Sequence, residues 1–147
     1  MPVATVIVIL RARAGEYPAV APPPYVGDLA FDGAFDARGL QKVARIEPHV
    51  VMLDLRGLSE PIGMLIGAAK LACPTAHVVA IGMPYDEHMA EQAIAAGASG
   101  FLTRDLGDQT LATAITNASR NAMHLTSTGM RAMSKLVDAH NREKAKS

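Results

Sequence analysis

The sequence is poor in aromatic residues and in cysteine. It has no tryptophan, and aromatic residues make up 4% of 147 residues while hydrophobic residues make up 50%. A folded core must therefore be aliphatic. The single cysteine, Cys73, cannot form an internal disulfide, which excludes a small disulfide-held scaffold and is typical of a protein in the reducing cytosol.

An excess of charge of one sign is also missing. Lys and Arg number 14, and Asp and Glu also number 14. Non-specific DNA binding depends on cations that attract the phosphates, so we expect this chain by itself to bind DNA poorly. The apolar run Val3 to Leu10 is far shorter than a membrane span of about 20 residues. It also has no basic segment before it, so we expect a cytoplasmic protein that binds no membrane.

Motifs of common enzymes are absent. The sequence has no Gly-x-Ser-x-Gly, no P-loop, no Gly-x-Gly-x-x-Gly and no cluster of zinc ligands, and its five histidines are scattered. We therefore expect no enzymatic activity, no cofactor and no metal.

Short apolar segments recur along the chain. Three of them are nearly continuous aliphatic runs, which is typical of strands in a parallel sheet that helices cover on both faces. The predicted strands are Val3 to Leu10, Val26 to Phe31, Val50 to Leu55, His77 to Ile81 and Gly100 to Thr103.

Helical patterns separate the later strands. They begin near Asp36, Pro61, Asp86 and Leu111, and each places apolar residues three and four positions apart. Strands that alternate with such helices form right-handed βαβ units. The pattern therefore predicts an α/β fold with a doubly wound parallel sheet of five strands.

The segment Arg11 to Tyr25 should contain the first crossover helix. It carries four prolines, which remove amide donors and clash with helical geometry. We therefore expect a proline-rich loop in place of this helix. The four residues are Pro18, Pro22, Pro23 and Pro24.

An extra C-terminal helix is predicted after residue 122. One face of it carries Met130, Met133, Leu136 and Val137, and the sequence beyond Asn141 is polar. We divide the chain into a domain over residues 1–122 and a C-terminal helix with a linker or tail over residues 123–147.

Over residues 3–122 the sequence resembles the receiver domain of two-component response regulators. The segment Pro48-His-Val-Val-Met-Leu-Asp-Leu-Arg56 resembles the third strand of that family, and Ala95-Ala-Gly-Ala-Ser-Gly-Phe-Leu-Thr-Arg-Asp105 resembles the approach to the fifth. The resemblance implies a flavodoxin-like strand order 2-1-3-4-5. It places Asp54 at the phosphoacceptor position and Phe101 at the position of the switch aromatic.

Other family positions depart from the pattern. The two acidic residues that hold magnesium are matched by Leu10 and Arg11, the hydroxyl residue after strand four by Gly82, and the lysine by Arg104. Mg²⁺ prefers oxygen ligands, and a leucine and an arginine supply none. The chain therefore resembles a degenerate receiver, and we predict that it is not efficiently phosphorylated by the magnesium-dependent route.

Two interpretations of the altered pocket stay open. Arg11 or Arg104 could form an ion pair with Asp54 that occupies the site, or both arginines could face solvent.

The first functional hypothesis is a regulator that acts without phosphorylation, through dimerisation or a protein partner. The alternative is a sensor that binds an anionic or aromatic metabolite in the crevice beside Gly82. Phosphotransfer through a rearranged metal site, with Glu16 or Asp86, is the weakest of the three.

We expect a two-fold homodimer that uses the last two helices or the sheet face beside the proline loop. In that case Met130, Met133, Leu136 and Val137 form the dimer helix. The alternative is that this stripe packs on its own domain. The chain end resembles regulators that continue into a helix-turn-helix output domain, which is not present in this sequence. The chain is thus either a stand-alone protein or a piece of a regulator whose output domain would contact DNA.

Overall fold

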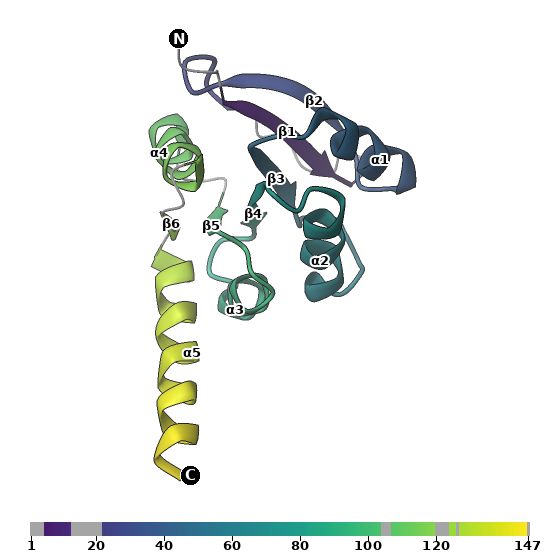
Figure 1. Ribbon diagram of the computed structural model, residues 1–147. Coiled ribbons are helices and arrows are strands. Elements are labelled where there is room, and N and C mark those ends of the chain that lie inside the picture. Colours follow the sequence, from purple (N-terminus) through teal and green to yellow (C-terminus); the bar gives the residue numbers. More distant parts are fainter. Residues whose placement is uncertain (1–4, 13–21, 104–106, 120–123, 126, 147) are drawn as a thin grey trace.

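The computed structural model describes residues 5–12, 22–103, 107–119, 124–125 and 127–146. Within these ranges a single parallel sheet has the strand order β2-β1-β3-β4-β5-β6 (Figure 1). The strands are β1 (Val6–Arg11), β2 (Asp28–Ala34), β3 (Val50–Asp54), β4 (His77–Gly82), β5 (Gly100–Thr103) and β6 (His124–Leu125). The helices are α1 (Ala37–Ile46), α2 (Ile62–Ala72), α3 (Glu87–Ala95), α4 (Gly107–Ser119) and α5 (Ser127–Lys146).

The predicted α/β fold and the order 2-1-3-4-5 are confirmed, with one strand added. β6 has only two residues, which pair with Gly100 and Phe101 at the outer edge of β5. Such a short strand leaves no periodic signal in a sequence. The second strand runs from Asp28 to Ala34 instead of Val26 to Phe31, because it is a largely exposed edge strand that lacks a continuous apolar run.

Alternate residues of the strands build two cores. On one face Val8, Val51, Leu53 and Val78 pack under α1, α2 and α3. On the other face Ile7, Ile9, Val50, Met52, Val79, Ile81 and Leu102 pack with Leu111, Ala114, Ile115 and Ala118 of α4. The central strands β1, β3 and β4 are buried on both faces, which explains why their sequences are almost entirely aliphatic.

Polar caps begin two of the helices where the sequence indicated. The Asp36 side chain accepts a hydrogen bond of 2.8 Å from the Gly39 amide at the start of α1. Asp86 does the same for the Met89 amide of α3, at 3.0 Å. These bonds satisfy amides that the first helical turn leaves without an internal partner.

The first crossover is described only in part. Residues 22–27 include a turn in which the Val26 amide donates to the Pro23 carbonyl at 3.1 Å, and none of them is helical. Residues 13–21, with Glu16 and Pro18, lie outside the described residues.

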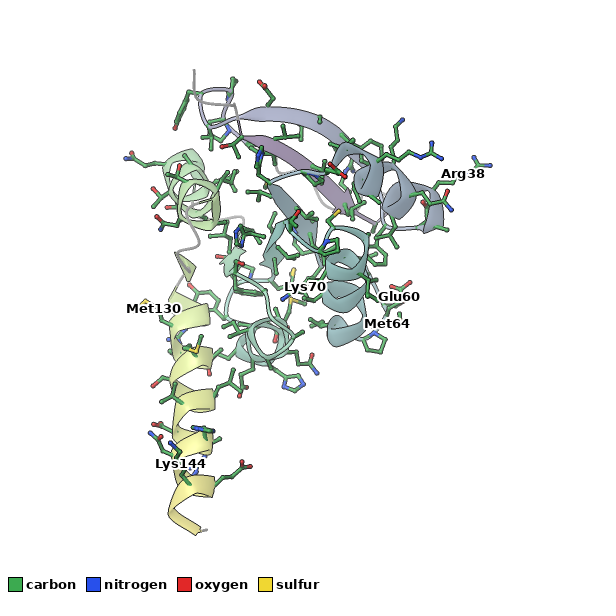
Figure 2. The ribbon with its side chains drawn as sticks, viewed as in Figure 1. Arg38, Glu60, Met64, Lys70, Met130 and Lys144 are labelled. Atoms are coloured by element: carbon green, nitrogen blue, oxygen red, sulfur yellow. The ribbon has the colours of Figure 1, made fainter. Side chains whose placement is uncertain are left out.

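The predicted C-terminal helix, α5, packs against α3 and extends away from the sheet (Figure 1). Ala132 is buried, and Met133 and Leu136 pack against the core of the domain. Met130 and Val137 are exposed, and Met130 points away from α3 (Figure 2). Half of the apolar stripe therefore packs within the domain, and the other half is exposed on the surface. Among the described helices, none is long and apolar enough to cross a membrane.

Candidate functional site

Asp54 ends the central strand β3 at the carboxyl edge of the sheet, where α/β proteins of this kind bind ligands. It pairs in register with Ile81 of β4, while its neighbour Leu53 pairs with Leu10 of β1. The residue is only 4% exposed. A carboxylate this deeply buried requires hydrogen bonds or a cation, because an unpaired buried charge is costly.

The cation is Arg56, which itself is 6% exposed. Its Nε donates to Asp54 Oδ1 at 2.9 Å and its Nη2 donates to Oδ2 at 2.8 Å. The Arg56 amide also donates to Oδ1, at 3.1 Å. This is a two-point guanidinium–carboxylate pair with an added backbone bond, a strong and directional arrangement.

A turn after β3 places Arg56 on Asp54. The Leu58 amide donates to the Leu55 carbonyl at 3.3 Å. Gly57, the third residue of this turn, has a φ of 80°, a conformation that favours glycine and is typical of a type II turn. Because the chain turns at Gly57, Arg56 stays beside the carboxyl end of β3.

Arg11 has a different partner from the one considered from the sequence. Its Nε donates to Asp32 Oδ1 at 2.7 Å, and this pair is about one third exposed. The hydrogen bond and charge of Asp32 raise the pKa of Arg11, and the charge of Asp54 adds a smaller effect in the same direction. The proposed Arg11–Asp54 pair is therefore wrong, and Arg104 lies outside the described residues.

Sequence reasoning missed Arg56 as a site residue. The signal was present, because Arg56 follows Asp54 by two positions within the quoted strand motif. The sequence hypotheses named arginines that follow other strands, because the turn after β3 depends on the conformation of Gly57, which a strand pattern does not show.

The positions that would hold magnesium carry no oxygen ligand. Leu10 is fully buried in the core, and Arg11 bears a positive charge. Within the described residues no three His, Cys, Asp or Glu side chains gather closely enough to hold a metal ion. The described part of the chain therefore offers no set of oxygen ligands that would hold Mg²⁺ beside Asp54.

Gly82 does not open the crevice as we expected from the sequence. A Cβ atom at this position would lie 2.5 Å from Cζ of Phe101 and 2.6 Å from Sδ of Met89. The Phe101 ring is fully buried. The space that a hydroxyl side chain would need is therefore filled by an aromatic ring and a thioether.

A hollow of about 430 Å³ lies elsewhere, along the outer side of α1. Arg38, Gln41, Lys42, Arg45 and Ile46 line it. The Lys42 ammonium sits 5.3 Å from the centroid of the Phe31 ring, a cation–π contact that ties α1 to the edge strand β2. This hollow is cationic, but it is not the crevice between Arg11 and Gly82.

No protein-family model and no curated protein sequence matches the chain. The chain does resemble solved structures. The chain superposes on the RcsB response regulator of Salmonella typhimurium with a TM-score of 0.65 and 13% identity, covering 91% of this chain and 67% of that one. A LuxR-family two-component response regulator from Aurantimonas sp. gives a TM-score of 0.67 and 16% identity, with 90% and 97% coverage.

The signal receiver domain assigned to NarL of Mycobacterium tuberculosis gives a TM-score of 0.62 and 17% identity, with 81% and 98% coverage. The chain therefore has the fold of response-regulator receiver domains, as the resemblance in its sequence predicted. It spans about two thirds of the length of the RcsB chain and nearly the whole of the isolated receiver structures.

Proposed function

We propose that this chain is an atypical receiver-like signalling domain that works without magnesium-dependent phosphorylation of Asp54 and regulates through dimerisation or a protein partner. The receiver fold supports a signalling role. The buried Asp54–Arg56 pair is the observation that carries the proposal.

Arg56 opposes phosphorylation through its contacts with Asp54. It occupies both carboxylate oxygens, so attack on a phosphorus atom requires the pair to separate. Without a metal that bridges nucleophile and phosphoryl oxygens, transfer loses its main electrostatic stabilisation.

The packing of Phe101 supports a domain held in one conformation. Its ring fills the volume beside Gly82 and contacts the core that α2 and α3 cover. A ring packed in this way resists movement, because protein interiors are dense and tolerate few alternative arrangements. A role in binding partners fits such a rigid domain better than a role in switching.

Self-association is part of the proposal. Structures of RcsB include dimers bound to DNA. Of the four residues predicted for the dimer helix, Met130 and Val137 are exposed on α5, whereas Met133 and Leu136 pack against the core. DNA would be reached only through an output domain in a longer regulator.

The test is intact-mass analysis after incubation with acetyl phosphate and excess Mg²⁺, on the wild type, Asp54→Asn and Arg56→Gln. We expect no phosphoryl adduct on the wild type. Arg11→Gln is the matched control, because it removes an arginine of the same edge that contacts Asp32 instead. An adduct on the wild type that Asp54→Asn abolishes would overturn the proposal.

The alternative function, a sensor of an anionic or aromatic metabolite, has less support. The space beside Gly82 is filled, and the Arg11 and Arg56 guanidinium groups both face carboxylates. A metabolite that raises the melting temperature progressively as its concentration increases would favour this alternative.

A further inference from the structure

The outer side of α2 is mostly apolar. The helix buries Leu65, Ile66 and Ala69 against the sheet, as its sequence predicted. Its opposite side, which we call the α2 face, consists of Gly63, Met64, Gly67 and Leu71. Met64 is 53% exposed and Leu71 is 85% exposed. A helix with apolar residues on both sides normally lies between two packing surfaces. Within the described residues, Met64 and Leu71 are left exposed on the outer side.

No close contact within the domain requires glycine at positions 63 and 67 of the α2 face. A Cβ atom added at Gly63 or at Gly67 would meet no atom within 4 Å. Glycine is disfavoured inside helices relative to alanine, so neither is explained by the stability of α2 itself. Small residues four positions apart do allow a second helix to approach closely, a steric effect that does not depend on the solvent.

The single charged residue of α2, Lys70, lies at the edge of this face, seven positions after Gly63, but its ammonium is directed to α3. The Lys70 ammonium donates to the Gly97 carbonyl at 3.1 Å and points toward α3, whereas Met64 lies on the other side of the helix (Figure 2). A two-fold interface brings a surface against its own copy. A charged surface would repel itself there, but the α2 face would not.

Charges at the two ends of this region complement each other under the same symmetry. Glu60 lies next to Met64 at the start of α2 (Figure 2), and Arg45 lies in the last turn of the neighbouring α1. Both crossover helices run from the carboxyl edge of the sheet to its amino edge. An antiparallel pair of α2 helices therefore moves Glu60 of one copy toward the end where the second copy carries Arg45.

We infer that the α2 face is the contact surface of a two-fold homodimer, with a second copy of this chain as its occupant. This inference rests on the self-association in the proposed function and assigns it to α2 instead of α5. Met64 and Leu71 of one copy pack beside Gly63 and Gly67 of the other.

The test is sedimentation velocity of the full 147-residue chain over a range of concentrations. Gly67→Leu adds a side chain where the monomer has open space, so its folding should be intact by circular dichroism. Gly67→Leu and Leu71→Glu should each weaken the dimer by at least about tenfold in Kd. The double variant Met130→Glu/Val137→Glu, which changes the exposed residues of α5, should leave the dimer unchanged.

Charge reversal gives a second measurement. Glu60→Arg should weaken the dimer, and adding Arg45→Glu should restore it. A wild type that stays monomeric throughout, or a Gly67→Leu variant that dimerises like the wild type, would overturn the inference. Phosphorylation of Asp54 is read out separately by mass, so failure of the proposed function and failure of this interface give different results.

Discussion

The Phe101 ring lies where a side chain at position 82 would have to be, since a Cβ atom on Gly82 would come within 2.5 Å of its Cζ. The glycine and the buried ring are therefore parts of one packing arrangement. The consequence is measurable, because the two positions cannot both carry a side chain without movement of the core.

Gly82→Ala should lower the free energy of unfolding by about 1–3 kcal/mol, the usual effect of overpacking a core. Gly67→Ala is the matched control, since it adds the same atom to open space on α2. It should raise stability by about 0.5–1 kcal/mol through helix propensity. Urea denaturation at a concentration where the chain is monomeric measures both. Equal effects of the two variants would contradict this packing.

Arg56→Met should destabilise the domain by about 3–5 kcal/mol, because it leaves the Asp54 carboxylate buried without its cation. Arg11→Met removes an arginine whose pair is about one third exposed, and should cost about 0–1 kcal/mol. Asp54→Leu combined with Arg56→Met should be less destabilised than Arg56→Met alone. Thermal denaturation of the three variants tests the order, and a milder effect of Arg56→Met than of Arg11→Met would refute it.

The attachment of α5 should weaken at low pH. Glu87 of α3 pairs with Arg131 and Lys135 of α5, and the hydrogen bond from Lys135 lowers the pKa of Glu87 below its usual 4.5. Because the pKa is lower in the folded state, the stabilisation is present above about pH 4.5 and is lost as pH falls through the lowered value. The melting temperatures of the wild type and Glu87→Gln should therefore differ at pH 7 and converge near the lowered value. A constant difference would argue against the pair, and Glu143→Gln is the control on an exposed α5 carboxylate.

Cys73 should react slowly with thiol reagents in the folded protein. Its side chain is buried, and burial raises the pKa of its thiol above 9.0, so little thiolate forms at pH 7. The rate with a chromogenic disulfide should rise by orders of magnitude in denaturant. Equal rates in the native and denatured protein would show that the C-terminal end of α2, which Cys73 caps, is open to solvent.

The aliphatic runs and helical stripes were enough to predict the sheet and its layers. Residues of β3 and β4 are buried on both faces, and a segment buried on both faces leaves a continuous hydrophobic signal. The position of Asp54 at the end of β3, and the lack of oxygen ligands at Leu10 and Arg11, were also readable, because they depend on residue type at the end of a recognisable strand.

Other features depended on the tertiary structure. β6 forms only by pairing with β5, and its two residues have no pattern of their own. The division of the α5 stripe into a packed side and an exposed side depends on where α3 lies.

The sequence alone thus determined the architecture and the chemical types at the carboxyl edge, since both are encoded in local runs and positions. The tertiary structure decided the partners. Arg56, in the turn that contains Gly57, pairs with Asp54. Arg11 pairs with Asp32 instead of Asp54, and the Phe101 ring fills the space beside Gly82. Pairing and filling are properties of atoms brought together from different strands and turns, and a one-dimensional pattern does not carry those distances.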